Sequence, residues 1–489
     1  MRAKEKIILF GGIFAYLMAV GVIVVLKHYY FQTQAWDLGI FDQLMWNTAR
    51  GNIMRGTLEP LSNHFAVHFS PFLFFLVPGY AIFPSPYFLL LVQTAALALG
   101  AVPLYLTAKR ILKTRFLALL LSLGYLIYPS LHSVNLFDFH PIAFAVPLFL
   151  TAFYFLEKKN WLWMGVFLGL AAFTQEEAII GAGFVGLYLI FTKEKKAGLW
   201  VLGLSVLYFL LATKIIMPFA GGGLLRLDRY SQLGHNFSEI VKNVILHPSL
   251  FWETIWMWPK LTYIFWLFLP VAFMPVLARR QCILLAPGLA QNLLTMYTPQ
   301  FSGAFQYDAV LIAGIFFSAV YGIKWLEDNV STKFILSLSK CSPSTKITCL
   351  KIILPVALLA GYFIHSPLSP FNFSQDAMFG SGGEREIFSR MVAKVPPGLS
   401  VSAATRLVPH LTGREYIYLL GQEPEPASPV GGSVDMVLFD NEDYFGFDTP
   451  EKFREHIQKY ADSGKYGAEI IDDRYYILVK KDLLPAPAH

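Results

Sequence analysis

Residues 7–26, IILFGGIFAYLMAVGVIVVL, form an apolar run of 20 residues that no charged side chain interrupts. A helix needs about 20 mostly apolar residues to cross a bilayer. Lys4 and Lys6 precede the run, and Lys27 follows it. The run is too long for the apolar core of a signal peptide, and the bulky sequence KHYYFQTQAWD after it offers no small-residue cleavage site. We therefore expect an uncleaved first membrane span.

Similar apolar runs recur along the first three quarters of the chain. They predict further spans at Pro86–Ala108, Phe116–Leu131, Pro141–Leu156, Trp161–Phe173, Ala178–Phe191, Leu199–Pro218, Leu261–Leu277, Ile283–Tyr297, Ala309–Ile323 and Ile352–Ile364. With the first run this makes about 11 transmembrane helices. The stretch Pro71–Phe83 is short and contains prolines, so it suits a re-entrant or interfacial segment better than a span. If it does cross, every later segment is inverted.

The composition of the whole chain excludes a soluble protein. Its 489 residues are 55% hydrophobic and only 15% charged, with a mean hydropathy of +0.50. An ordinary soluble domain carries about 25% charged residues. The three cysteines, Cys282, Cys341 and Cys349, provide neither a disulfide framework nor a CxxC metal site.

Charge is unevenly distributed along the chain. Residues 381–489 hold 12 Lys/Arg and 17 Asp/Glu, whereas the first 380 residues hold 27 basic and 16 acidic residues. We therefore predict an all-α polytopic membrane domain over residues 1–365, a linker over 366–383 and a small soluble α/β domain over 384–489. In the last domain the residue pattern predicts helices at 386–395 and 450–461, strands at 399–405, 415–420 and 434–440, and a terminal hairpin at 468–481 that turns at Asp472–Asp473.

Basic residues indicate the orientation in the membrane, because cytoplasmic loops are enriched in Lys and Arg. With the N-terminus in the cytoplasm and the spans given above, 19 basic residues fall in inner loops and 7 in outer loops. This bias favours an N-in arrangement with the C-terminal domain outside the cytoplasm. It also accounts for most of the net charge of +6, so no nucleic-acid partner is implied. We expect a multi-pass protein of the plasma membrane.

In this arrangement acidic residues gather on the outer side, in hydrophobic surroundings. They lie in four separate turns, which contain Asp37 and Asp42, Asp138 with His140, Glu176 with Glu177, and Asp308 beside Tyr307. Ionisable groups at membrane depth are costly and usually face a cavity or a partner. We therefore expect one shared outer pocket, although each acid could instead be a hydrated loop charge.

The spacing of several residues refines this expectation. Asp37 and Asp42 would lie about 140° apart on a helix, so only one of them can face the pocket. The apolar pattern between Trp36 and Trp46 is typical of an amphipathic helix lying on the membrane. His64 and His68 are four residues apart, a spacing that can bind a metal, but no HExxH motif is present, so contact with substrate at the pocket rim is the favoured reading.

Arg226 and Arg229 lie in the outer segment LLRLDRYSQLG. Their guanidinium groups could grip a lipid phosphate, since arginine forks match phosphate oxygens. A loop ion pair with Asp228 is the alternative. No GxGxxG, Walker, GxSxG or CxxC motif supports a nucleotide-driven or serine-hydrolase mechanism. The sequence requires no cofactor, although a divalent metal could bridge Asp37, Asp138 or Glu176 to a phosphate.

Several segments together resemble an uncharacterised family of archaeal and bacterial membrane proteins that is usually grouped with the GT-C glycosyltransferases. They are WDLGIFDQLMWNTARG (36–51), HFAVHFSPFLFFLVPGYAIFPSP (64–86), FDFHP (137–141), FTQEEA (173–178) and VSAATRLVPHLTGREYIY (401–418). The resemblance covers nearly the whole chain. It implies a GT-C-like fold, a polyprenyl-phosphate sugar donor and a catalytic acid at Asp37, where many members carry Asp-Glu and this chain has Asp37-Leu38. Glu176 or Glu177 resembles a later acid near the active site of several members.

These observations lead to a hypothesis for the function. A sugar would pass, with inversion, from a lipid donor to a glycan, lipid or protein acceptor on the outer side, with Asp37 as general base. The other outer residues, Asp42, His64, His68, Asp138, His140, Glu176, Glu177, Arg226, Arg229 and Tyr307, would bind substrate. The alternative is a proton- or ion-coupled transporter or lipid flippase, in which the acids are ion sites. Against it, the chain shows no internal repeat.

Overall fold

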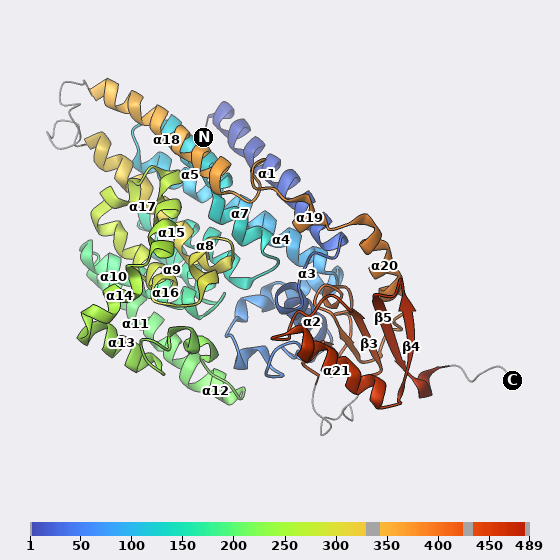
Figure 1. Cartoon of the computed structure of the whole chain (residues 1–489). Helices are drawn as coiled ribbons and strands as arrows, with labels where there is room; N and C mark the ends of the chain where they lie inside the picture. Colours follow the sequence, from blue (N-terminus) through green and yellow to red (C-terminus); the bar gives the residue numbers. More distant parts are fainter. Residues whose placement is uncertain (1, 329–342, 424–433, 485–489) are drawn as a thin grey trace.

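The computed structural model describes residues 2–328, 343–423 and 434–484. This part of the chain is mainly helical and carries one small β-sheet near the C-terminus (Figure 1). α1 (Ala3–Tyr29) and α18 (Pro343–His365) both pack against α6 (Arg115–Leu126), and the sheet lies toward the C-terminal end of α1. The membrane-type helices thus lie toward one end of the molecule, and the sheet lies toward the other end.

Six helical segments of the described chain are long and apolar enough to cross a membrane. They are α1, α4 (Pro86–Leu99) with α5 (Ala101–Ile111), α6 (Arg115–Leu126) with α7 (Pro129–Leu136), α11 (Lys195–Leu211) with α12 (Met217–Phe219), α17 (Ala309–Asp328) and α18. Shorter apolar helices are α8 (Ala145–Glu157) and α9 (Trp161–Ala172). Each lies where the sequence predicted a span, while the total of about 11 spans and the N-in orientation stay predictions.

The two spans predicted at Leu261–Leu277 and Ile283–Tyr297 form a single bent pair. The first arm is α15 (Trp258–Phe268), which continues to Val271. The second arm is a 3₁₀ stretch at Met274–Leu285 that leads into α16 (Ala286–Leu293). The helix direction bends by 109° between the two arms. The bend has a local cause, because Ala272 and Phe273 adopt positive φ angles of 50° and 55°. Residues with a Cβ leave the right-handed helix at that point.

Helix α10 (Glu176–Phe191) and α11 approach each other unusually closely. A Cβ atom on Gly186 would lie 2.6 Å from the backbone nitrogen of Leu202, and one on Gly198 would lie 2.7 Å from the carbonyl oxygen of Gly186. Only glycine permits this distance, which is how small residues let membrane helices pack. The crossing fixes the direction in which α10 carries Glu176 and Glu177.

Short segments join the long helices. They are a π-helical turn at Ala35–Gly39, α2 (Ile40–Thr48), 3₁₀ turns at His64–Ala66, Pro71–Phe75, Pro141–Phe144, Leu225–Tyr230, Thr298–Phe301 and Gln306–Asp308, and the helices α3 (Val77–Ile82), α13 (Phe237–Leu246) and α14 (Pro248–Ile255). The segment 71–83 therefore holds a 3₁₀ turn and a six-residue helix, which are too short to cross a bilayer.

The C-terminal part is a five-stranded mixed sheet with two longer helices. Its strands are β1 (Val401–Ala403), β2 (Ile417–Leu419), β3 (Met436–Asp440), β4 (Tyr466–Ile471) and β5 (Tyr475–Lys480), in the order β2-β1-β3-β5-β4. β1 is parallel to β2 and β3, and β5 is antiparallel to β3 and β4. The helices are α19 (Gln375–Phe379), α20 (Gly382–Ala393) and α21 (Pro450–Asp462), and a short 3₁₀ turn spans Val408–His410.

This part confirms the elements predicted there. The β4–β5 hairpin turns through Asp472 and Asp473, with φ angles of 52° and 54°. Two successive positive φ angles are typical of the type I′ turn that favours Asp and Asn.

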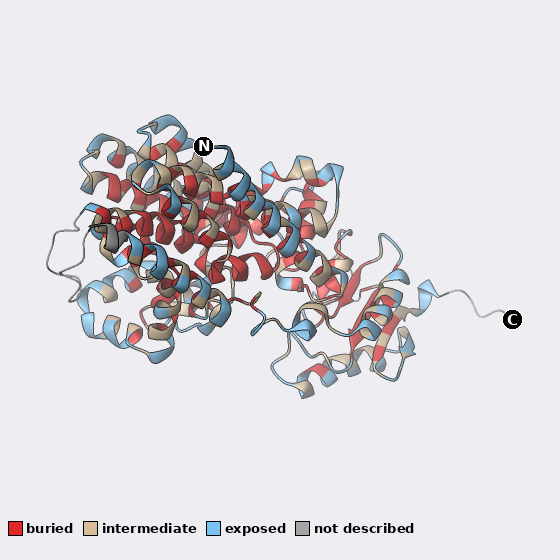
Figure 2. Ribbon diagram, turned by 90° about the horizontal axis from the view of Figure 1, so that it is seen from above, coloured by how far each residue is buried: buried red, intermediate tan, exposed pale blue. Residues whose placement is uncertain are grey.

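The core of the sheet also includes residues from the segment that follows α1. Phe31, Ala35 and Leu58 are buried among its side chains. The backbone N–H of Ala35 donates to Oγ1 of Thr405, and Nε of Arg406 donates to the carbonyl of Phe31. Figure 2 shows buried residues both in the helical bundle and in the sheet, and the half-buried Ile40 packs against the hydrophobic clusters of both. The segment after α1 thus positions the sheet over one end of the bundle.

Candidate functional site

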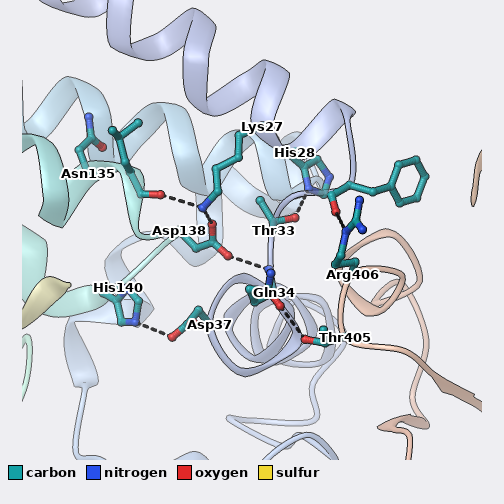
Figure 3. A network of polar contacts seen from close by, with 12 residues as sticks. Lys27, His28, Thr33, Gln34, Asp37, Asn135, Asp138, His140, Thr405 and Arg406 are labelled. Carbon is teal, nitrogen blue, oxygen red and sulfur yellow. Dashed lines mark hydrogen bonds and ion pairs between the residues drawn. The ribbon is translucent and has the colours of Figure 1, made fainter. Parts of the chain in front are cut away.

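Asp37 and His140 form a pair at the sheet-facing end of the bundle. Oδ1 of Asp37 lies 2.8 Å from Nε2 of His140, and their side chains are 17% and 8% exposed (Figure 3). Asp37 sits in the π-helical turn Ala35–Gly39, a rare local geometry that is frequent at functional sites. His140 follows α7 and begins the Pro141–Phe144 turn. The structure therefore joins two of the predicted outer turns directly.

Asp138 holds this arrangement in place. Its Oδ1 lies 2.6 Å from Nζ of Lys27, and its Oδ2 accepts the backbone N–H of Gln34 at 2.8 Å (Figure 3). Nζ of Lys27 also donates to the carbonyl of Leu136. Both oxygens of Asp138 are therefore occupied, so its role in the structure is to fix the segment that leads into the π-helical turn. The sequence indicates Lys27 only as a charge that follows the first span on the predicted outer side.

Glu176 makes a second contact between two of the predicted outer turns. Its Oε1 accepts the backbone N–H of Phe69 at 2.5 Å, and its Oε2 lies 3.3 Å from Nδ1 of His68. Burial alone would lower the pKa of His68, but the Glu176 carboxylate raises it, to about 9. The neighbouring Glu177 has a buried Oε2 that no described residue contacts by a hydrogen bond.

His64 is oriented by another carboxylate. Its Nδ1 lies 2.8 Å from Oε2 of Glu59, while its Nε2 is buried and without a hydrogen-bond partner in the described chain. The segment is pinned by the Gly-rich turn after α12, since the N–H of Gly223 donates to the carbonyl of Ala66. A Cβ on Gly222 would lie only 1.9 Å from that same carbonyl oxygen, so a glycine is needed there.

Arg229 projects into a ring of aromatic residues. Its guanidinium carbon lies 4.2 Å from the centroid of Tyr297 and 5.5 Å from that of Tyr307, and NH1 lies 3.3 Å from the Tyr307 hydroxyl. Arg226 differs, since it is exposed and makes no ion pair or hydrogen bond within the described residues. No ion pair joins Asp228 to either arginine in that same part of the chain. Of the predicted pair, only Arg229 is thus held in a fixed environment.

Aromatic contacts connect these groups into one region. Phe41 packs against both His64 and His140, with ring centroids 5.5 Å and 6.0 Å apart. From His140 a further series of ring contacts leads to Arg229 through Phe137, Phe305 and Tyr307. His64 and His68 have ring centroids 6.2 Å apart. The structure therefore gathers Asp37, His64, His68, Asp138, His140, Glu176, Arg229 and Tyr307 in one neighbourhood, whereas its role as a substrate pocket stays a prediction.

Asp42 faces a different direction from Asp37, as the helical spacing indicates. It is 2% exposed, and its carboxylate accepts the hydroxyls of Tyr80, at 2.8 Å, and of Thr412. Burial raises the pKa of Asp42 to about 7, although both hydroxyls favour the ionised form. Asp42 thus links α2 to α3 and to the C-terminal part.

Unpartnered polar atoms are a second property of the region. Nδ1 of His140, Nε2 of His64 and Oε2 of Glu177 are all buried without a hydrogen-bond partner among the described residues. Such atoms are rare in folded proteins because desolvation is costly, and they gather where ligands bind. The described chain places no group of three or more His, Cys, Asp or Glu side chains suitably for holding a metal ion.

The model of one protein family, described as predicted membrane protein (DUF2079), matches residues 27–477. The chain belongs to this family. The match spans both the helical bundle and most of the sheet, and it establishes a multi-pass membrane protein. No curated protein matches the chain.

Two solved structures share the fold. The crystal structure of ArnT from Cupriavidus metallidurans bound to undecaprenyl phosphate has a TM-score of 0.55 at 12% sequence identity, and the similarity covers 98% of this chain and 99% of that one. The apo structure of the same protein has a TM-score of 0.51 at 13% identity and covers 94% and 97%. ArnT is a GT-C glycosyltransferase, so the expected GT-C-like fold is confirmed for this DUF2079 chain. At this identity the similarity concerns the fold alone.

Proposed function

We propose that the chain is a membrane glycosyltransferase that moves a sugar from a polyprenyl-phosphate donor to an acceptor on the extracytoplasmic side. The observation that carries the proposal is the Asp37–His140 pair at 2.8 Å, placed where several predicted outer turns meet. The fold supports it, because the similar ArnT structure was solved with undecaprenyl phosphate bound. The proposed location is the plasma membrane, with the C-terminal sheet outside the cytoplasm.

Asp37 acts as the general base in this mechanism. Nε2–H of His140 donates to the Asp37 carboxylate and orients it toward the acceptor hydroxyl. Asp37 takes the hydroxyl proton while the acceptor oxygen attacks the anomeric carbon from the face opposite the phosphate. The bond between that carbon and the phosphate oxygen breaks, and its electron pair leaves with the polyprenyl phosphate. The sugar is transferred with inversion.

Arg229 is the proposed ligand of the donor phosphate. Its guanidinium group is confined between Tyr297 and Tyr307 and keeps donors free for the phosphate oxygens. Arg226, which is exposed, would join it when the lipid binds. Glu176, Glu177, His64 and His68 would contact the sugar or the acceptor.

A transfer assay tests the proposal. Purified protein in nanodiscs receives a radiolabelled polyprenyl-phosphate sugar and a pool of glycan, lipid and protein acceptors. We expect transfer by the wild type, loss with Asp37→Asn, and unchanged transfer with the control Asp376→Asn, which alters an exposed acid on α19. Absence of transfer, or transfer that survives Asp37→Asn, contradicts the mechanism.

Two further measurements complete the experiment. Movement of a fluorescent polyprenyl phosphate across the membrane of proteoliposomes, without sugar transfer, would support the flippase alternative instead.

The proposed steps need no resident cofactor, and the contribution of a divalent metal is tested in a separate experiment. Treatment with EDTA, followed by addition of Mg²⁺ or Mn²⁺, shows whether an ion contributes.

A further inference from the structure

A cavity of about 290 Å³ lies between the bundle and the C-terminal part, on the side of α2 that Asp42 faces. α2 contributes Asp42 and Trp46, the turn after α2 contributes Arg50, the end of α1 contributes His28, and the segment 409–413 of the C-terminal part closes it. The cavity therefore exists only where the two parts of the chain pack together. Its volume is near the lower limit of about 300 Å³ for ligand sites, which suits a small ligand.

Its polar groups are held in fixed positions. The guanidinium carbon of Arg50 lies 3.9 Å from the Trp46 ring centroid, and NH1 of Arg50 donates to the Trp46 carbonyl. The indole N–H of Trp46 has no hydrogen-bond acceptor in the described chain. Asp42 is anchored by Tyr80 and Thr412. The cavity thus offers the donors of the exposed Arg50 and of the half-buried Trp46 next to the buried carboxyl group of Asp42.

His410 adds a polar edge to the cavity, since the two faces of its ring are covered by His28 and Phe31. The rings of His28 and His410 stack in parallel, with centroids 4.1 Å apart and planes within 2°. Nε2 of His410 is buried and has no partner among the described residues. Burial lowers the pKa of His410, so its ring is neutral and presents both a donor and an acceptor.

This combination discriminates between classes of ligand. A phosphate or other anion would meet one arginine and a carboxyl group, and an apolar ligand would leave the indole N–H and the guanidinium donors unpaired. A polyhydroxylated ring needs donors and acceptors together with aromatic surface for its C–H faces. Asp42, Arg50 and Nε2 of His410 supply the polar groups, and Trp46 and Tyr80 supply the aromatic surface. We propose that this cavity binds a single neutral sugar unit.

The proposed sugar site is separate from the Asp37–His140 pair. Asp37 is directed to His140 and the bundle, whereas Asp42 is directed to Tyr80 and Thr412. The inference therefore does not depend on the transferase proposal. A sugar bound here would hold the C-terminal part against α2, because both parts of the chain contact it.

Saturation-transfer difference NMR on the full-length protein in nanodiscs tests the inference. The probes are glucose, galactose, mannose and N-acetylglucosamine, each titrated separately. We expect one of them to bind, Arg50→Ala and Asp42→Asn to weaken it by about tenfold or more, and Arg454→Ala, which removes an exposed arginine on α21, to leave it unchanged. Asp37→Asn also leaves this binding intact, which distinguishes it from the transferase site.

The opposite results overturn the inference. One such result is that none of the four sugars binds. Another is that Arg50→Ala and Asp42→Asn leave sugar binding unchanged. A third is that inorganic phosphate displaces the sugar, which would indicate an anion site. The thermal unfolding of each variant shows whether it folds. If Arg50→Ala or Asp42→Asn does not fold, Trp46→Phe is tested instead. It removes the indole N–H but keeps an aromatic ring, so we expect it to weaken the sugar about tenfold as well.

Discussion

Nε2 of His140 lies 2.8 Å from Oδ1 of Asp37, although the two residues are 103 positions apart in the sequence. One comes from the π-helical turn after α1 and the other from the turn after α7, so the contact joins two segments that are far apart in the sequence. A donor that fixes a carboxylate also fixes the direction in which it can accept a proton. In the proposed transfer reaction, His140 is therefore a positioning residue.

Replacement of His140 tests this role. His140→Phe removes the donor and should lower the rate of sugar transfer by about 10- to 100-fold, the loss of one charge-assisted hydrogen bond. His140→Gln keeps a donor and should retain most of the rate. The initial rate of transfer and its pH profile are the measurements, since a purely structural residue would change protein yield without moving the profile. Equal rates for both variants would contradict the positioning role.

Lys27 and Asp138 form a buried ion pair, so the loss of one partner leaves the other uncompensated. We expect Lys27→Met to lower the free energy of unfolding by about 3–5 kcal/mol, and Asp138→Asn in the same chain to restore part of it. Thermal unfolding of the two single variants and the double variant in detergent measures the coupling. Lys4→Met, at the exposed start of α1, is the control. Additive effects of the two substitutions would show that the pair is not coupled.

The sequence predicted most of the elements, because each depends on local pattern. Apolar runs placed the membrane helices, and the Asp472–Asp473 turn followed from its two flanking strands. Pairings between distant segments could not be predicted in the same way. Lys27 and Asp138 are 111 positions apart, and Asp42 and Thr412 are 370 apart. One signal was present: Lys27 is a basic residue on the predicted outer side, where the positive-inside rule expects few.

The bend between α15 and α16 was also missed. Both arms are apolar, and together they are long and hydrophobic enough to cross a membrane. Composition therefore does not distinguish two spans from one bent pair. The deciding feature is the pair of positive φ angles at Ala272 and Phe273, which are residues that do not favour this conformation by themselves.

Asp42 should make stability depend on pH. Its pKa is about 7 in the folded protein against 3.8 ordinarily, so the folded form binds the proton more tightly than the unfolded chain. The stabilisation is complete below about pH 4 and is lost as the pH rises through about 7, by up to about 4 kcal/mol. Asp42→Asn stays neutral and should flatten this part of the profile. The unfolding midpoint between about pH 5 and about pH 9 measures it; parallel profiles for the two proteins would contradict the assignment.

Gly186 is the point at which α10 meets α11, and its replacement should separate the helices. A Cβ there would lie 2.6 Å from the nitrogen of Leu202 and 2.9 Å from the carbonyl oxygen of Gly198, and backbone atoms on both sides cannot move aside cheaply. We expect Gly186→Ala to cost about 1–3 kcal/mol of unfolding free energy. Gly203→Ala on α11 is the matched control, because no atom lies within 4 Å of its added Cβ.

The control should be neutral or stabilising by up to about 1 kcal/mol, since alanine is the better helix former. The thermal unfolding midpoint of both variants in the same detergent provides the comparison. If Gly186→Ala unfolds at the temperature of Gly203→Ala, the close crossing of α10 and α11 is wrong. The direction in which α10 carries Glu176 and Glu177 would then have to be assigned again.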